Sequence, residues 1–176
     1  MMTTKNYILK TTNLSIGYAN KSETNTIAST INLGLEKGKL IALIGENGIG
    51  KSTLLKTLTG IIPPLNGVVT LLNKSLQNFK PLALAQELSI VLTEKLPPSN
   101  LTVYEIIALG RQPYTNWLGS LSDEDTTKID EAIALTEINH LIHKKHDEVS
   151  DGQLQIALIA RALAQDTSII ILDEPT

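Results

Sequence analysis

The spacing of apolar and polar positions changes several times along the chain, and each change predicts a different element. Residues 7–18 alternate loosely, and residues 26–35 end in a turn-like segment at 36–39, which predicts strands joined by turns. Residues 40–44 (LIALI) form a short uninterrupted apolar run, which is typical of a strand buried on both faces. Residues 67–72 and 88–93 are two further strand candidates. The N-terminal part of the chain is therefore predicted to consist mainly of strands and turns.

Helical spacing becomes prominent between these strands and after them. A helix is predicted directly after a glycine-rich turn, because three leucines fall on one side of a helical pattern and Gly60 then ends it. Residues 102–105 (TVYE) have the form of a capping box and predict a helix over 103–110. Ser122 and the three acidic residues behind it begin another helix, since acidic groups suit a helix N-terminus. A further helix is predicted over 152–165.

The composition is that of an ordinary globular protein, and it excludes several classes of function. Hydrophobic residues make up 42% and charged residues 19% of the chain, which suits a packed core. A formal charge of -3 gives no broad attraction to nucleic acid or to an anionic membrane. The absence of cysteine excludes disulfides, thiolate metal sites and thiol nucleophiles. No secretory signal and no membrane-spanning apolar run is visible, so we expect a cytoplasmic location.

A glycine-rich loop carries the clearest chemistry. Residues 45–53 read GENGIGKST, which fits the pattern glycine, four residues, Gly-Lys-Ser. The glycines allow successive backbone N–H groups to point at phosphate oxygens, with a helix N-terminus behind them. Lys51 can reach the β- and γ-phosphates, and the Ser52 hydroxyl can ligate Mg²⁺. The predicted phosphate-binding residues are Gly45, Glu46, Asn47, Gly48, Ile49, Gly50, Lys51, Ser52 and Thr53.

The alternative interpretation of this loop is a chance glycine-rich turn. The predicted strand before the loop and the predicted helix after it are the context that the phosphate-binding motif requires. We therefore prefer the functional interpretation. The loop by itself does not separate kinases, GTPases, helicases and transport ATPases.

A second acidic motif ends the chain. Residues 168–173 (SIIILD) predict a buried strand that ends in an acid, and Glu174 follows it. At the C-terminal edge of a sheet, Asp173 can hold Mg²⁺ through water, and Glu174 can polarise a water molecule that attacks the γ-phosphate. The alternative is an edge strand that ends in solvated acids, which the presence of the phosphate loop disfavours.

Residues 149–156 (VSDGQLQI) open the predicted helix between these two motifs. The order of phosphate loop, this segment and IIILDEPT resembles the ABC ATPases over essentially the whole chain. The resemblance implies an α/β P-loop NTPase fold with a mixed central sheet, an N-terminal antiparallel β part and an inserted α-helical subdomain. It also implies three segments: residues 1–94 as the nucleotide-binding core, 95–165 as the helical subdomain, and 166–176 as the strand that returns to the core.

The resemblance also implies a composite ATP site with ATP and Mg²⁺ as cofactors. Two such domains of the family pair head to tail, so that the signature segment of one completes the ATP site of the other. The Ser150 hydroxyl, the Gly152 N–H and the positive end of the helix are suitable donors for a γ-phosphate. Tyr18 stands where the family has an aromatic residue that stacks on adenine. The implied signature residues are Ser150, Asp151, Gly152 and Gln153.

Residues 101–111 (LTVYEIIALGR) are similar to the helical subdomain of importers for iron-siderophores, haem or cobalamin. This implies an ATPase motor at the inner face of a membrane, with transmembrane permease subunits, a periplasmic or surface solute-binding protein and no nucleic acid as partners. A soluble ABC protein in translation or repair is one alternative. A non-catalytic module that binds ATP as a structural ligand is another.

The sequence departs from the family pattern in several places. Thr93 stands where these importers have a glutamine, and its hydroxyl can approach Mg²⁺ only through water. Asp151 replaces a glycine, and its carboxylate repels a γ-phosphate unless it turns away or caps its own helix. The family's segments after the second acidic motif are missing, so we expect an uncovered apolar sheet edge and little ATP hydrolysis. The three histidines are expected to be solvated rather than metal ligands; they are His140, His143 and His146.

Overall fold

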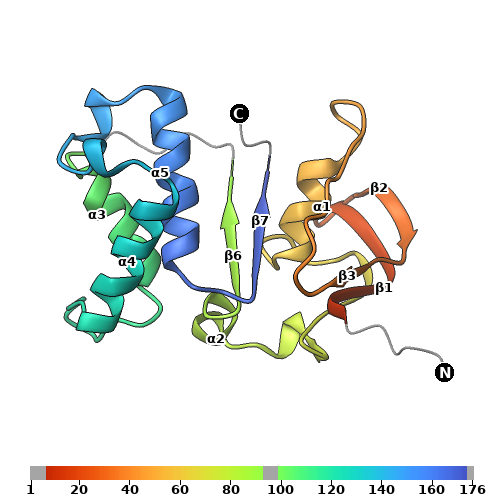
Figure 1. Cartoon of the computed structure of the whole chain (residues 1–176). Helices are drawn as coiled ribbons and strands as arrows, with labels where there is room; N and C mark the ends of the chain where they lie inside the picture. Colours follow the sequence, from red (N-terminus) through yellow and green to blue (C-terminus); the bar gives the residue numbers. More distant parts are fainter. Residues whose placement is uncertain (1–6, 93–98, 174–176) are drawn as a thin grey trace. The chain divides into compact units, whose positions relative to one another are not determined.

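The computed structural model describes residues 7–92 and 99–173. The chain divides into two compact units, residues 1–80 and 81–176. Figure 1 shows that each unit contains its own sheet and its own helices.

The first unit is an antiparallel sheet with an α-helix of eight residues. Its strands are β1 (Tyr7–Ala19), β2 (Thr24–Ile31), β3 (Gly34–Glu36), β4 (Asn66–Leu71) and β5 (Lys74–Ser75). The strand order is β2-β1-β4-β5, and β3 also pairs with β1. The register joins Leu14 to Ile31 on one side of β1 and Thr12 to Val68 on the other. β1 therefore pairs with β2, β3 and β4 and connects them into one sheet.

Helix α1 (Lys51–Leu58) packs against β1, and a 3-10 turn follows β5 at Leu76–Asn78. Leu54 and Leu58, which the leucine spacing predicted on one side of this helix, are buried. The helix is followed by Gly60 with φ +78°, as the predicted stop requires. The buried apolar side chains of this unit are Ile8, Leu9, Leu14, Ile16, Leu54, Leu58, Val69, Leu71 and Leu76.

The apolar run at residues 40–44 does not form the buried strand that its composition predicts. These residues belong to no strand, and Leu40 is 101% and Ile44 91% exposed. An apolar run favours burial, but a strand also needs a neighbour for its backbone hydrogen bonds. Within the described part of the first unit, no strand pairs with this run.

The second unit combines a helical cluster with a parallel strand pair. Its elements are α2 (Pro81–Ala85), β6 (Leu88–Val91), α3 (Val103–Ala108), α4 (Asp123–Leu135), α5 (Asp151–Ala164) and β7 (Ile169–Leu172). Short 3-10 helices occur at Leu109–Arg111, Asn139–Leu141 and His146–Glu148. Strands β6 and β7 pair in parallel, and Figure 1 shows α3, α4 and α5 on one side of this pair.

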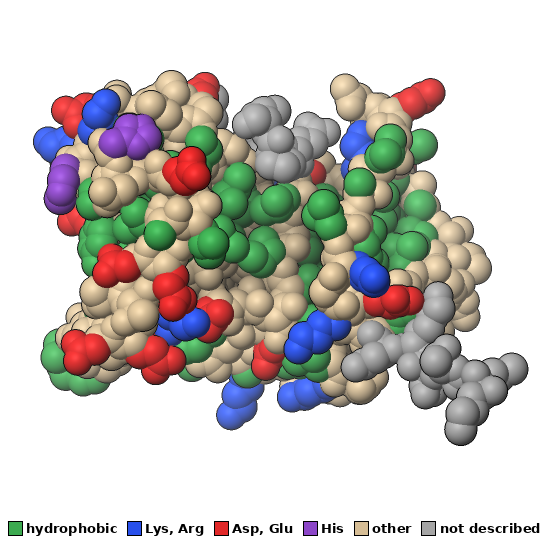
Figure 2. All heavy atoms as spheres, in the orientation of Figure 1, with side chains coloured by type: hydrophobic (Ala, Val, Ile, Leu, Met, Phe, Trp, Pro, Cys, Tyr) green, Lys and Arg blue, Asp and Glu red, His purple; other side chains and the backbone are tan. Residues whose placement is uncertain are grey.

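Two apolar clusters hold the second unit together. The larger one lies among the three helices and consists of Val103, Ile107, Ile129, Ala132, Ile133, Ile138, Leu141, Ala157, Ala160 and Ala164. The smaller one joins β6 to α3 and α5 and consists of Val91, Ile106, Leu158 and Ala162. The side of α4 that faces away from these clusters carries many of the acidic side chains seen on the face drawn in Figure 2.

Both helix starts predicted from capping residues are confirmed. Thr102 Oγ1 accepts from the Glu105 backbone N–H at 3.2 Å, and a Glu105 carboxylate oxygen accepts from the Thr102 N–H at 2.7 Å. The Thr102 N–H and the Thr102 hydroxyl both donate to the Glu105 carboxylate and lower its pKa. Ser122 and Asp125 form the same reciprocal pair at the start of α4. The helix predicted over 103–110 leaves α-helical geometry after Ala108 and continues as a 3-10 turn.

A buried ion pair, which the sequence did not predict, joins three elements of the second unit. Arg111 Nε lies 2.7 Å from Asp125 Oδ1, and both side chains are almost fully buried. Arg111 Nη1 also donates at 3.0 Å to the carbonyl of Ala164, the last residue of α5. A Cβ at Gly110 would overlap the Arg161 carbonyl. Glycine therefore allows the close approach to α5 that makes the Arg111 contacts possible.

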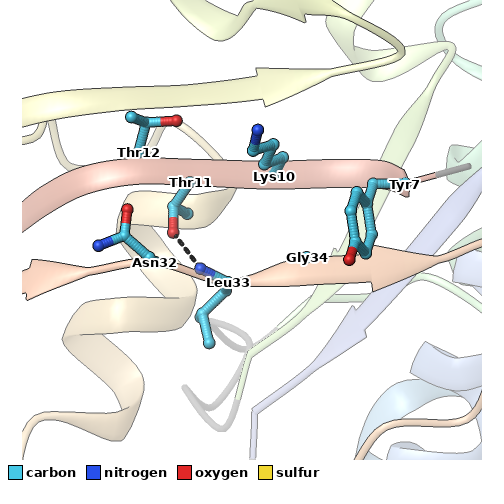
Figure 3. A pocket seen from close by; sticks show the side chains of 7 residues that line it. All are labelled: Tyr7, Lys10, Thr11, Thr12, Asn32, Leu33 and Gly34. Atoms are coloured by element: carbon cyan, nitrogen blue, oxygen red, sulfur yellow. Dashed lines mark hydrogen bonds between the residues drawn. The ribbon is translucent and has the colours of Figure 1, made fainter. Parts of the chain in front are cut away.

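An open hollow of about 280 Å³ lies on the first unit beside β1 and β3. Figure 3 shows Thr11 at its centre, where the Thr11 hydroxyl accepts from the Leu33 N–H at 2.8 Å. The same hydroxyl donates to the Ile31 carbonyl at 2.9 Å. The lining residues are Tyr7, Lys10, Thr11, Thr12, Asn32, Leu33 and Gly34. None of them belongs to the site that the sequence predicts.

Candidate functional site

The glycine-rich loop leads directly into α1. Gly48 and Gly50 have φ values of +81° and +105°, which glycine adopts without strain. A Cβ at Gly50 would also overlap the side chain of Ile27, so glycine is required there for two reasons. Gly50 is the N-cap of α1 and provides no side-chain cap. The helix N-terminus behind the loop therefore has no N-cap side chain, and such an end favours an anion.

The Lys51 side chain folds back over this loop. Its Nζ donates to the carbonyl oxygens of Gly45 and Glu46, both at 2.9 Å. The ammonium group therefore lies beside the backbone turn and near the N-terminus of α1. The helix dipole also favours negative charge at this end, so two independent effects attract an anion to the loop.

Tyr18 lies beside the first turn of α1, although it is 35 residues away in the sequence. Its hydroxyl is 3.2 Å from the Thr53 hydroxyl, and either can be the donor. Thr53 is buried and Tyr18 is half exposed. Ser52 occupies the second position of α1, between Lys51 and Thr53. The structure thus brings the predicted loop residues and the predicted aromatic residue together in the first unit.

The signature segment forms the N-terminus of α5 in the second unit. The Ser150 hydroxyl accepts from the Gln153 N–H at 3.3 Å, and Gln153 Oε1 accepts from the Ser150 N–H at 3.0 Å. Because this hydroxyl acts as an acceptor within the helix start, its own proton can be donated elsewhere. Asp151 is exposed in the first helical turn, where the helix dipole favours its charge.

Gly152 differs from Gly50 in its surroundings. A Cβ built at Gly152 meets no atom within 4 Å. It also lacks a positive φ. Packing within the described part of the chain therefore does not require glycine at this position.

Asp173 is the residue directly after β7. The backbone N–H of Asp173 donates to the Val91 carbonyl at 2.9 Å, and the residue is 4% exposed. The strand before it is only partly buried as predicted: Ile171 is 7% exposed, whereas Leu172 is 37% exposed. Thr93 and Glu174 lie outside the described residues, so their predicted roles stay predictions.

The three histidines lie in loops and 3-10 turns near the start of α5. His140 and His143 are exposed, and His146 begins a 3-10 helix. Figure 2 shows histidine side chains on the surface of the second unit. Within residues 7–92 and 99–173, no three histidines or carboxylates come close enough to hold a metal ion. In the same ranges, no helix has the length and apolar character needed to cross a membrane.

Residues 28–176 match the ABC transporter family. An ABC transporter ATP-binding protein of Methanocaldococcus jannaschii is 44% identical over 169 residues, which cover 96% of this chain and 57% of that protein. The achromobactin transport ATP-binding protein of Dickeya dadantii is 40% identical over 93% of this chain and 59% of its own length. The chain thus spans less than two thirds of these curated relatives.

Solved structures of ABC transporter proteins are also similar to this chain. A metal-chelate type ABC transporter in an inward-facing conformation is similar with a TM-score of 0.78 and 30% identity, over 97% of this chain and 61% of that one. A dimeric ATP-binding cassette in a post-hydrolysis state, bound to ADP and phosphate, gives a TM-score of 0.79 and 27% identity, over 96% of this chain and 74% of that one. The P-loop NTPase fold expected from the sequence is confirmed, and the chain belongs to the ABC transporter family.

Proposed function

We propose that this chain is the ATP-binding part of an importer subunit that couples ATP binding and hydrolysis to the uptake of an iron-siderophore, haem or cobalamin type solute. The start of α1 carries this proposal, because Gly48, Gly50 and Lys51 leave backbone donors and an ammonium group at an uncapped helix N-terminus. The solute class is supported by a relative named for achromobactin transport and by a metal-chelate type structural neighbour.

The proposed chemistry follows from the groups at the loop. The loop N–H groups and Lys51 bind the β- and γ-phosphates, and the Tyr18 ring stacks on adenine. When bound, Mg²⁺ neutralises charge that develops on the phosphate oxygens. Ser52, Thr93 and Asp173 are the residues proposed to hold it, directly or through water. Glu174 is proposed to polarise the attacking water.

The proposed signature surface is the start of α5. Ser150 retains a hydroxyl proton for donation, and the surroundings of Gly152 are open, which suits the close approach of a second subunit. A head-to-tail dimer in which Ser150, Asp151, Gly152 and Gln153 face the nucleotide of the other copy is therefore proposed. The dimeric cassette among the structural neighbours supports this assembly.

Further partners are also part of the proposal. They are transmembrane permease subunits and a periplasmic or surface solute-binding protein, with the chain peripheral on the inner face of the membrane. The three-part division at residues 1–94, 95–165 and 166–176 remains a proposal of the same kind. Co-purification of the whole protein tests this assignment. A multi-span permease in the purified complex would support it, and ribosomes would contradict it.

Isothermal titration calorimetry with Mg-ATP tests nucleotide binding directly. Lys51→Ala should weaken binding about 100-fold, because a charge-assisted contact to the phosphates is lost. Lys37→Ala is the matched control, since Lys37 is an exposed lysine of the same unit outside the loop. Equal binding by the two variants would contradict the proposed site.

A further inference from the structure

The chain contains two Asn-Gly pairs, at residues 47–48 and 66–67. In such a pair the glycine nitrogen can attack the side-chain carbonyl carbon of the asparagine. A carbon–nitrogen bond forms, ammonia leaves with the proton of the glycine N–H, and a succinimide ring results. Water then opens either carbonyl of the ring and yields aspartate or isoaspartate. Glycine favours this reaction because no Cβ hinders the attacking nitrogen.

The first pair is at the exposed tip of the glycine-rich loop. Asn47 and Gly48 are both exposed, and a Cβ built at Gly48 would meet no atom within 4 Å. The backbone hydrogen bond across this turn is a long contact of 3.5 Å from the Ile49 N–H to the Glu46 carbonyl, and the Lys51 ammonium contacts the same carbonyl from its side chain. Within the described ranges, the Asn47 side chain forms no hydrogen bond. The backbone here can therefore rotate into the geometry that ring closure needs.

The second pair is held in the sheet. Asn66 begins β4 and is in register with Ser15 of β1. The Gly67 N–H donates to Asn66 Oδ1 at 2.8 Å. A Cβ at Gly67 would overlap the Asn13 carbonyl, so this backbone lies directly against β1. Ring closure at Asn66 requires that the end of the ladder first opens.

We propose that Asn47 is a site of spontaneous deamidation and that Asn66 is protected by the fold. Each event exchanges an amide NH₂ for a hydroxyl that ionises, so the loop gains one negative charge. The isoaspartate product also inserts an extra methylene group into the backbone of the loop. Both changes oppose an anion in the same cradle. The chemical step needs only water, whereas its effect on nucleotide binding rests on the proposed function.

Peptide mass spectrometry of the aged chain tests the proposal. After incubation in mildly alkaline buffer, trypsin separates the two sites, because Asn47 falls in residues 40–51 and Asn66 in residues 57–74. Conversion should be on the order of tenfold faster at Asn47, since only Asn66 needs local opening. In urea the two sites should react at similar rates. Equal rates in the folded chain, or the same rate difference in urea, would overturn the proposal.

Two variants complete the test. Asn47→Gln should abolish the conversion in the 40–51 peptide, because the longer side chain closes its ring far less readily. Asn47→Asp represents one product and should bind Mg-ATP about tenfold more weakly than the fresh chain. Mg-ATP should slow conversion at Asn47 and leave Asn66 unaffected. If conversion at Asn47 proceeds but Mg-ATP gives no protection, nucleotide binding at the loop is contradicted and the modification site stands.

Discussion

Helices α1 and α5 both begin at motifs that the sequence singles out, but their ends are satisfied in opposite ways. Helix α1 starts behind Gly50, which has no side chain to cap it. Helix α5 starts with the reciprocal hydrogen bonds of Ser150 and Gln153. Its other end accepts a hydrogen bond from the guanidinium of Arg111. Side chains of the protein thus hold α5 at both ends, whereas the N-cap of α1 contributes no side chain.

This difference concerns both stability and function. Four N–H groups at a helix start lack partners within the helix, and they must be satisfied by side chains, water or a ligand. The phosphate proposed to bind there would therefore add stability at α1 by mass action. At α5 the capping side chains already supply partners, so this helix is expected to keep its shape whether a ligand is present or not.

Arg111→Ala tests the closed end of α5 and should have the largest effect. It leaves the Asp125 carboxylate buried without its cation, and we expect a loss of about 3–5 kcal/mol in the free energy of unfolding of the second unit. Urea unfolding with hydrogen exchange resolved by peptide measures it. The double variant Arg111→Ala with Asp125→Ala should lose less than the sum of the single variants, because the isolated charge is gone. Additive losses would mean that the two side chains do not interact.

Gly50→Ala tests the open start of α1. A residue at φ +105° that also overlaps Ile27 should destabilise the first unit by about 1–3 kcal/mol. Gly152→Ala is the matched control at the start of α5, where the Cβ meets nothing and alanine has the higher helix propensity, so the change should not destabilise the helix. The same peptide-resolved exchange experiment compares the two variants. An equal response would remove the distinction between these glycines.

The pH dependence of the second unit follows from Asp125. Burial raises the pKa of this carboxyl, but hydrogen bonds from Ser122 and Arg111 outweigh that effect, so its pKa lies below the ordinary value of an aspartate. A depressed pKa contributes stability above the unfolded-state value, and this contribution disappears as the pH falls through the folded-state value. Urea unfolding below the unfolded-state pKa should therefore show a less stable second unit. A loss confined to higher pH would contradict this assignment.

Ser150→Ala should have the smallest effect of the four. Removal of an N-cap hydroxyl costs about 1 kcal/mol of helix stability. Exchange of the first-turn amides of α5 should accelerate, while α1 stays unchanged. Ser150→Asp should restore most of the protection, since a carboxylate is also a good N-cap. If Ser150→Asp does not restore the exchange protection of this turn, the Ser150 hydroxyl has a role other than capping.

Features encoded by residues that are close together in the sequence could be predicted. The capping boxes at Thr102 and Ser122 and the glycine-rich loop are of this kind, because each depends on neighbours along the chain. The prediction of a strand at residues 40–44 was wrong, because an apolar pattern does not specify a hydrogen-bonding neighbour. The pair of Arg111 and Asp125 could not be predicted, because residues 14 positions apart meet only through the packing of the helices.

The position of β1 has a consequence for the synthesis of the chain. β1 leaves the ribosome well before its partner β4. The Thr70 hydroxyl of β4, for example, donates to the Lys10 carbonyl of β1 across 60 residues. During that interval one edge of β1 has no partner, and unpaired strand edges favour association with other chains. The glycine-rich loop and α1 are made within the same interval. The nascent chain thus contains the proposed phosphate-binding segment before β1 and β4 can pair.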